Sequence, residues 1–160
     1  MASSITASDG FTRFVREQGR RLQHGLIAAL GRDVGIEATS EALAYGWEHW
    51  ERIGAMENPV GYLFTVGRNW GRHQFRVRSA VPFPEVTLVT RSDPMVEPAL
   101  PAALAGLSER QRVATMLVYG ADWTTAEVAV LLGVDRGTVH KHAERGLRKL
   151  RRALEVHVNA

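Results

Sequence analysis

Residues 123–142 read Trp-Thr-Thr-Ala-Glu-Val-Ala-Val-Leu-Leu-Gly-Val-Asp-Arg-Gly-Thr-Val-His-Lys-His, and this stretch decides the fold. The hydroxyl of Thr124 or Thr125 can cap a helix by accepting a backbone N–H. The apolar run that follows ends at Gly133, and glycine closes helices well because it adopts a left-handed backbone freely. Asp135 can then cap a second helix. Two helices joined by so short a turn indicate a helix-turn-helix.

The second helix of this motif has an apolar side and a basic side. Its apolar positions recur at helical spacing, at Val139, Ala143, Gly146, Leu147 and Leu150. Between Gly133 and Arg152 there are seven Lys or Arg residues and two acids. Such a stripe can neutralise phosphates while its first residues reach base edges. The alternative is a charged helix face that only contacts solvent, but it does not explain the turn and capping residues that precede the helix. We predict DNA binding through Arg136, Thr138, His140, Lys141, Arg145, Arg148 and Arg152.

Composition excludes several classes of protein. The chain has 160 residues, 45% of them hydrophobic, and a net charge of +3. It has no cysteine, so disulfides, thiolate chemistry and cysteine-based zinc sites are excluded. No apolar run approaches the roughly 20 residues of a membrane span, and the first residues lack a signal-peptide pattern. We therefore expect a soluble, cytoplasmic protein with no membrane insertion.

The rest of the chain predicts an all-α fold of two small helical domains. After a frayed terminus at 1–8, helices are expected over about 9–30, over about 35–53, and from Asn58-Pro59 to Arg78. Five of the six prolines lie between Pro82 and Pro101, and proline stops helices. We therefore predict a domain over 9–78, a linker over 79–98 with few contacts across it, and a helix-turn-helix domain over 99–156.

The second and third predicted helices each have a sided pattern. Trp47 and Trp50, in the second predicted helix, are expected to be residues of the hydrophobic core. In the third helix, Leu63, Val66, Trp70 and Val77 share the predicted buried side. Phe64 and Phe75 fall near the arginine side, where they could either stack on bases or pack inward. We predict that this helix binds DNA phosphates through Arg68, Asn69, Arg72, Arg76 and Arg78.

With both halves analysed, the chain resembles bacterial RNA polymerase sigma factors of the extracytoplasmic-function (ECF) type, in the sigma-70 family. The match to the promoter-binding region 4 is carried by Leu107-Ser-Glu-Arg-Gln-Arg, Glu127-Val-Ala-Val-Leu-Leu-Gly-Val, Gly137-Thr-Val and Arg145-Gly-Leu-Arg-Lys-Leu-Arg. The match to region 2 is carried by Trp47 and by Asn58-Pro-Val-Gly-Tyr-Leu-Phe-Thr-Val-Gly-Arg-Asn. Together these matches cover about residues 11–78 and 99–155.

The resemblance implies partners and roles. The C-terminal domain would read the upstream promoter element, and the third helix with its preceding loop would bind and help open the downstream element. The second helix would dock on core RNA polymerase through Glu37, Ser40, Glu41 and Glu48. The family usually has Asp-Leu-Val-Gln-Glu there, whereas this chain has Glu37-Ala-Thr-Ser-Glu41. An anti-sigma factor is a candidate further partner.

Two other functions remain open from the sequence. One is a helix-turn-helix regulator of the LuxR type, although the first half lacks the strands of a receiver domain. The other is a sigma-like adaptor with a weakened polymerase contact, which Ser40 favours. We expect no enzyme, no catalytic residues, no cofactor and no metal. His140 and His142, for example, point about 200° apart on a helix and cannot share an ion.

Overall fold

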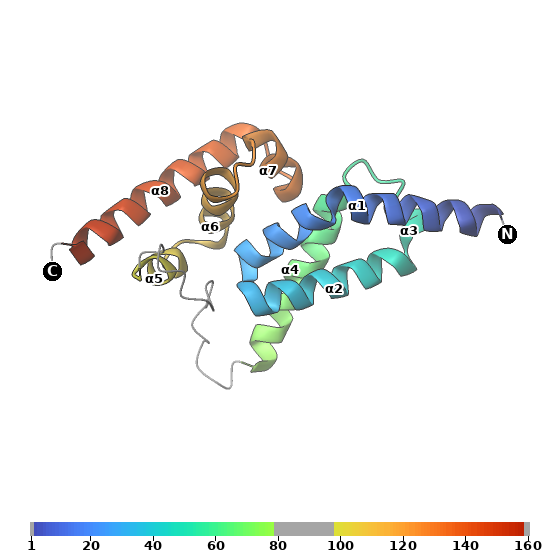
Figure 1. Cartoon of the computed structure of the whole chain (residues 1–160), viewed down its shortest axis with the longest axis horizontal. Coiled ribbons are helices and arrows are strands. Elements are labelled where there is room, and N and C mark those ends of the chain that lie inside the picture. Colours follow the sequence, from blue (N-terminus) through green and yellow to red (C-terminus); the bar gives the residue numbers. More distant parts are fainter. Residues whose placement is uncertain (1, 79–97, 159–160) are drawn as a thin grey trace.

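All regular elements of the computed structural model are helices within residues 2–78 and 98–158, which are the residues it describes. The first half contains α1 (Ala2–Leu30), α2 (Arg32–Glu48), α3 (Trp50–Ile53) and α4 (Pro59–Arg78). The second half contains α5 (Leu100–Ala105), α6 (Glu109–Thr115), the π-helical segment η1 (Met116–Gly120), α7 (Thr125–Leu132) and α8 (Arg136–Val158). Figure 1 shows these elements, and the all-α prediction is confirmed. No helix in the described ranges is long and apolar enough to span a membrane.

In the first half, α1 and α2 lie side by side and α4 crosses them (Figure 1). Gly31 ends α1 and makes the sharp turn into α2, because its φ of 85° favours glycine. The buried face of α2 consists of small residues, Gly35, Ala38, Thr39, Ala42 and Gly46. Small side chains let helices approach closely, so α2 packs tightly while its opposite face stays in solvent.

Three predictions about α1 and α2 were wrong. The first helix begins at Ala2, well before Asp9. The second helix does not continue to Ile53, because it ends at Glu48 and His49 breaks it with φ −118° and ψ 21°. Trp47, expected in the core, is 54% exposed because the neighbouring Gly46 takes the buried position.

After the break, Trp50 does pack inward, against aromatic rings of α1. Its ring lies 5.3 Å from that of Phe11 and 5.0 Å from that of Phe14. The edge of Phe11 also meets Trp47 at 5.4 Å. The expectation that both tryptophans are core residues therefore holds for Trp50 alone.

The third predicted helix is confirmed as α4, with Asn58 capping it through a 3.0 Å hydrogen bond from Gly61 N–H. Phe64, placed near the arginine side, is only 1% exposed, because the second half of the protein covers that side. Phe75 is half-buried and packs against the same core. Val77 is 66% exposed, contrary to prediction, since the last turns of α4 extend past α1 and α2 (Figure 1).

In the second half, α6, α7 and α8 surround the buried side chains of Val113, Leu117, Val128 and Val139. A capping box begins α6, in which Gln111 N–H donates to Ser108 Oγ at 3.3 Å. A smaller cluster of Leu104, Leu107 and Leu150 joins α5 and the turn after it to the C-terminal half of α8. These contacts fix α8 along most of its length.

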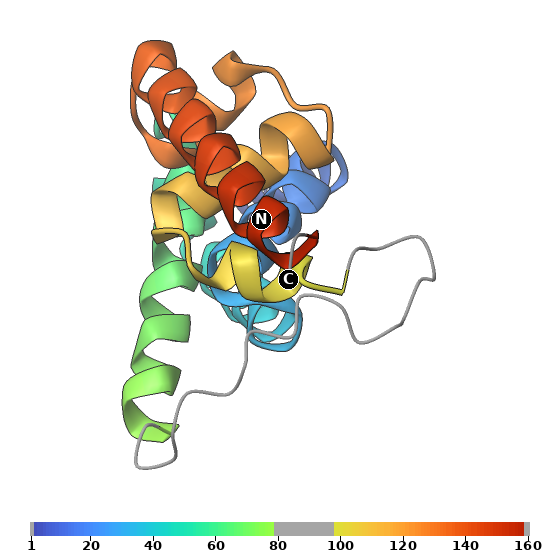
Figure 2. The ribbon, with the colours of Figure 1, turned by 90° about the vertical axis from the view of Figure 1, so that its left-hand side faces the viewer.

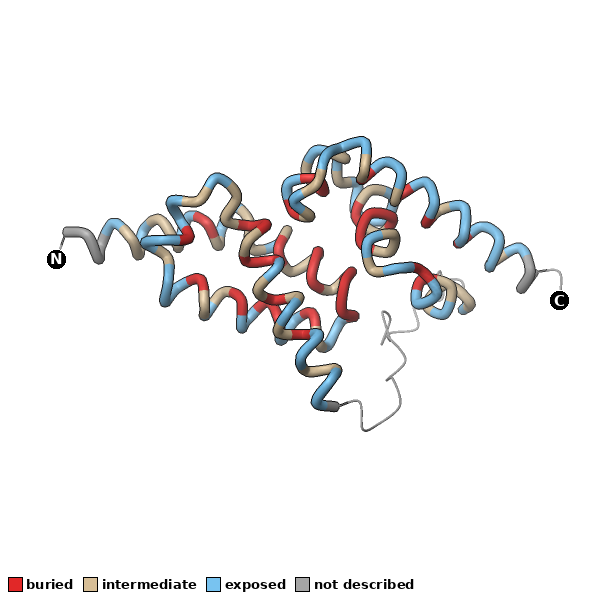
Figure 3. The backbone as a smooth tube through the Cα atoms, turned by 180° about the vertical axis from the view of Figure 1, so that it is seen from behind, coloured by how far each residue is buried: buried red, intermediate tan, exposed pale blue. Residues whose placement is uncertain are grey.

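The prediction of few contacts between the halves was wrong. One core cluster contains Leu26 and Phe64 from the first half together with Val113 and Leu131 from the second. Figure 3 shows buried segments of both halves facing each other. The residues that led to the linker prediction, 79–97, lie outside the described residues, so the domain boundaries stay a prediction.

Gly146 provides a stability test, because α8 crosses α6 at this residue. A Cβ at Gly146 would lie 2.0 Å from Thr115 Oγ1 and 3.1 Å from the Gln111 carbonyl oxygen. We predict that Gly146→Ala lowers the free energy of unfolding by about 1–3 kcal/mol through overpacking, measured by urea denaturation. Gly106→Ala is the control, since the nearest atom to its Cβ is 3.4 Å away. Equal stability of Gly146→Ala and wild type would contradict this packing.

Candidate nucleic-acid interface

The helix-turn-helix is built from local capping interactions that the sequence predicted. Thr124 caps α7 by accepting from Glu127 N–H, and Thr124 N–H donates to the Glu127 carboxylate at 2.8 Å. These bonds lower the pKa of the Glu127 carboxyl. Gly133 then ends α7 in the left-handed region, with φ 66° and ψ 36°. The turn into α8 is therefore fixed by side chains and backbone that lie within a few residues of it.

Asp135 caps α8 and positions its first polar side chain. Its carboxylate accepts a 2.8 Å bond from Thr138 N–H and a 2.6 Å bond from the Thr138 hydroxyl. These bonds lower the pKa of Asp135. The carboxylate thereby holds the Thr138 hydroxyl in one orientation at the beginning of α8.

The two sides of α8 lie as predicted. Val139, Ala143 and Leu150 are buried, and Leu147 is half-buried. Figure 2 shows the ribbon of α8 nearest the viewer, in front of the helices of the first half. Thr138 is half-buried, and the other predicted DNA-binding residues of this helix are all exposed: Arg136, His140, Lys141, Arg145, Arg148 and Arg152.

The two histidines of α8 differ in their surroundings. His140 Nε2 lies 3.3 Å from Glu144 Oε1 on the exposed side. His142 is half-buried, and burial, followed by the charges of Arg110 and Arg145, lowers its pKa. Its Nδ1 is buried without a hydrogen-bond partner. His142 therefore favours the neutral form and supplies no charge to the basic side. No group of three potential metal ligands exists among the described residues.

The arginines of α4 form a second basic surface, and part of it is covered. Asn69, Arg72 and Arg76 are exposed. Arg68 is half-buried, with its guanidinium 5.7 Å from the centre of the Phe64 ring. The carboxylate of Glu109 on α6 approaches both Arg68 and Arg72. The side chain of Arg78 is not among those that the structure describes.

Glu109 was not predicted as part of any site. Glu109 is far from the arginines of α4 along the chain, 37 positions after Arg72, so no spacing pattern links them. The local pattern marks it only as an acid in the first turn of α6. A contact between helices so distant in the chain leaves no signal in a single sequence.

The acidic patch predicted on α2 is present as a surface. Glu37, Ser40, Glu41 and Glu48 are all exposed. Beside them, Ile36 exposes 38% of its surface, which the sequence analysis missed. The Ser40 hydroxyl donates to the Ile36 carbonyl at 3.4 Å. The patch therefore combines three exposed carboxylates with one exposed apolar side chain.

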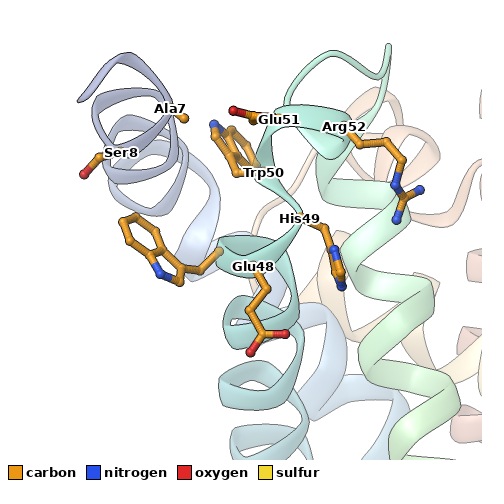
Figure 4. Close-up of a pocket in the computed structure, with 8 residues that line it drawn as sticks. Ala7, Ser8, Glu48, His49, Trp50, Glu51 and Arg52 are labelled. Carbon is orange, nitrogen blue, oxygen red and sulfur yellow. The ribbon is translucent and has the colours of Figure 1, made fainter. Parts of the chain in front are cut away.

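A pocket of about 500 Å³ lies where α2 breaks into α3, next to the start of α1. Figure 4 shows that the Trp50 side chain lies toward Ala7 of α1 and that the Arg52 side chain lies on the other side of α3. Arg52 donates hydrogen bonds to the hydroxyls of Tyr45 (3.1 Å) and Tyr62 (3.4 Å). The bond from Arg52 lowers the pKa of Tyr62. Arg52 of α3 thus joins Tyr45 of α2 to Tyr62 of α4, a cluster of one cation and two aromatic rings that the sequence analysis did not assemble.

Comparisons with known proteins agree with this geometry. The family model for sigma-70 region 4 matches residues 98–150. The ECF RNA polymerase sigma factor SigL from each of three strains of Mycobacterium tuberculosis is 32% identical over 130 residues, covering 74% of this chain and 73% of the relative. The sigma factor RpoE of Bartonella quintana, solved with the anti-sigma factor NepR, matches at 21% identity and a TM-score of 0.66, covering 91% of this chain and 97% of that chain.

The fold and the exposed basic helix define a helix-turn-helix protein of the transcription apparatus. The identity and coverage of the mycobacterial relatives show which family it is: the chain belongs to the ECF RNA polymerase sigma factors. The resemblance noted from the sequence is thereby confirmed, and the LuxR-type alternative is set aside.

Two arginines of α8 test how it contacts DNA. Arg145 lies early on the exposed side, where a groove-inserted helix meets bases, and Arg152 lies two turns later. We predict that Arg145→Ala costs on the order of 1–3 kcal/mol of binding and relaxes the preference at one base pair. Arg152→Ala should weaken binding to all DNA sequences alike. It should also reduce the slope of log binding constant against log salt concentration by about one unit.

Salt titrations of a promoter duplex and a scrambled duplex measure both effects. Equal losses on both duplexes for both variants would show that α8 does not read sequence.

The Asp135 cap predicts a pH dependence of stability. The lowered pKa of Asp135 means that its cap is fully present above the ordinary carboxyl value and is lost as pH falls through the lowered value. Asp135→Asn keeps a capping side chain without this titration. We expect the stability difference between wild type and Asp135→Asn to change below about pH 4 and to stay constant above it. A constant difference throughout would contradict the charged cap.

Proposed function

We propose that this chain is a sigma factor that binds core RNA polymerase and directs promoter-specific transcription initiation. The observation that carries the proposal is the exposed basic side of α8, which the helix-turn-helix fixes by caps at both ends of its turn. A helix presented in this way fits the major groove of duplex DNA. We assign α8 to the upstream promoter element.

The α4 helix and the loop before it are proposed to bind the downstream element and help to open it. Arg72 and Arg76 supply positive charge for the phosphate backbone. The cluster of Tyr45, Arg52 and Tyr62 lies beside the beginning of α4, and the exposed ring of Trp47 lies at the end of α2 against Phe11 of α1. Aromatic faces beside cations bind unstacked bases in single strands. This arrangement supports strand opening at the same end of the molecule.

The exposed patch of α2 is proposed to contact core polymerase. Its carboxylates, Glu37, Glu41 and Glu48, would meet basic residues of the polymerase, and Ile36 would add an apolar contact. Ser40 lies in the middle of this patch and cannot make the longer reach of the family's glutamine. We therefore expect a functional contact that is weaker than in sigma factors with the usual motif.

Other properties follow from this role. Catalysis would be supplied by the polymerase and not by this chain, and the chain would act in the cytoplasm with that enzyme.

An anti-sigma factor remains a candidate partner. An apolar groove of about 450 Å³ between the halves, lined by Ile27, Leu104, Met116 and Leu147 among others, could accept an apolar helix of such a partner.

The proposal is tested by capturing core polymerase with the purified chain and sequencing the DNA retained. A sigma factor would retain core polymerase and enrich fragments that share two short elements at a constant spacing. Retention of polymerase with no shared elements would favour the adaptor function. Enrichment of DNA without retention of polymerase would indicate a DNA-binding regulator.

Glu41 tests the polymerase contact specifically. We predict that Glu41→Lys weakens binding to core polymerase at least several-fold, because it reverses a charge at the centre of the α2 patch. The matched control is Glu17→Lys, which reverses an exposed acid on α1. Surface plasmon resonance with immobilised polymerase gives both affinities, and circular dichroism checks that helix content is unchanged. Equal affinities for the two variants would place the docking surface elsewhere.

A further inference from the structure

The basic side of α8 contains an exposed acid that the proposed function does not use. Of the two acids between Gly133 and Arg152, Asp135 forms the cap and Glu144 is exposed further along the helix. Glu144 lies one turn after Lys141 and one turn before Arg148, on the same side of α8. A carboxylate among these cations repels the phosphates that they attract. It therefore weakens binding to every duplex unless it accepts a hydrogen bond from the DNA.

A histidine one turn nearer the beginning of α8 positions this carboxylate. His140 Nε2 lies 3.3 Å from Glu144 Oε1, and the two side chains are 62% and 51% exposed. Side chains on a helix lean toward its N-terminus, and the contact with His140 holds that of Glu144 in the same direction. An ionised carboxylate has about four acceptor sites, so this contact leaves capacity for a further donor.

The position of Glu144 along α8 is within reach of base edges. Glu144 lies about 12 Å along the helix axis from Arg136, the first residue of α8. A helix inserted in the major groove contacts bases through its first turns, and the groove is itself about 12 Å wide. Two turns before Glu144 on the same side, Gly137 is exposed and has no side chain, so the backbone there can approach DNA closely. On a helix docked in this way, the Glu144 carboxylate faces base edges.

The four bases differ in what they offer a carboxylate in the major groove. Guanine presents two acceptors, and thymine presents an acceptor and a methyl group, so neither can donate to Glu144. Adenine has an amino group, but the N7 acceptor beside it repels the second carboxylate oxygen. Cytosine presents its N4 amino group, which is the donor that glutamate and aspartate contact. The chemistry of the groove therefore favours cytosine opposite Glu144.

We propose that Glu144 reads a cytosine of the upstream promoter element by accepting a hydrogen bond from its N4 amino group, and that His140 is the positioning residue for this contact. The inference rests on the proposed role of α8 in binding duplex DNA, and it adds the identity of one base. Glu144 then lowers the affinity for all other sequences and offsets that loss only where cytosine is present. Its contribution is to discrimination between sequences, because it acts against the wrong base as well as for the right one.

Selection from a pool of duplexes with a randomised segment tests this contact in the full chain. Wild type should enrich cytosine at a position where the enrichment depends on Glu144. Glu144→Ala should lower the preference for cytosine there by roughly fivefold or more, retain the preferences at other positions, and bind a scrambled duplex more tightly than wild type. Glu144→Gln should move the preference at that position toward adenine, because glutamine pairs with adenine N6 and N7.

Two further substitutions separate the contact from charge and from fold. Glu17→Ala removes the same charge from an exposed position of α1 and should select the wild-type sequence. His140→Ala should lower the preference for cytosine at the same position in the wild-type chain and have no further effect there in the Glu144→Ala chain, since coupled residues are not additive. Circular dichroism confirms that each variant is folded.

The outcomes distinguish this inference from the proposed role of α8. If Arg145→Ala changes the selected sequence while both Glu144 variants select the wild-type sequence, α8 reads DNA and the role of Glu144 is overturned. An equal loss of preference at all positions in Glu144→Ala also overturns it, because Glu144 then supports the helix and does not read a base. If wild type selects no shared sequence, α8 does not read DNA and both proposals fail.

Discussion

The burial of α1 between two groups of helices is the constraint on which the structure depends. Leu22 and Leu26 are inaccessible to solvent, and Leu30 nearly so. One side of this segment packs on α2 and α4, and the other packs on α6 and η1. Arg112 then satisfies the carbonyls at its end. Removing either layer would expose apolar surface and unpaired carbonyls together, which is costly.

This constraint separates surfaces that carry function from surfaces that hold the fold. The small-residue face of α2 is used up by packing, which leaves Glu41 and its neighbours in solvent. The basic side of α8 stays exposed because its apolar side faces α6 and α7. The arginines of α4 are intermediate, since they lie where the two halves meet. Glu109 of α6 approaches Arg68 and Arg72 there, whereas Arg76 is exposed.

Local signals predicted well what local interactions determine. The caps at Thr124 and Asp135, the left-handed Gly133 and the sidedness of α8 all rest on residues within one or two turns. The errors involve tertiary contacts. Phe64 is buried by α1 and the second half, and Trp47 is exposed because α2 uses its small residues for packing. Glu109 and Arg112 act on partners far along the chain, so no spacing in the sequence reveals them.

The most direct measurement of the central claim is run-off transcription with purified core polymerase and this chain, followed by mapping of the transcript starts on fragmented genomic DNA. A sigma factor should produce starts that require the chain and lie at a constant distance from two shared upstream elements. Substitution of those elements should abolish the corresponding transcripts. Stable binding to polymerase without any new starts would contradict the claim and identify the chain as a sigma-like adaptor.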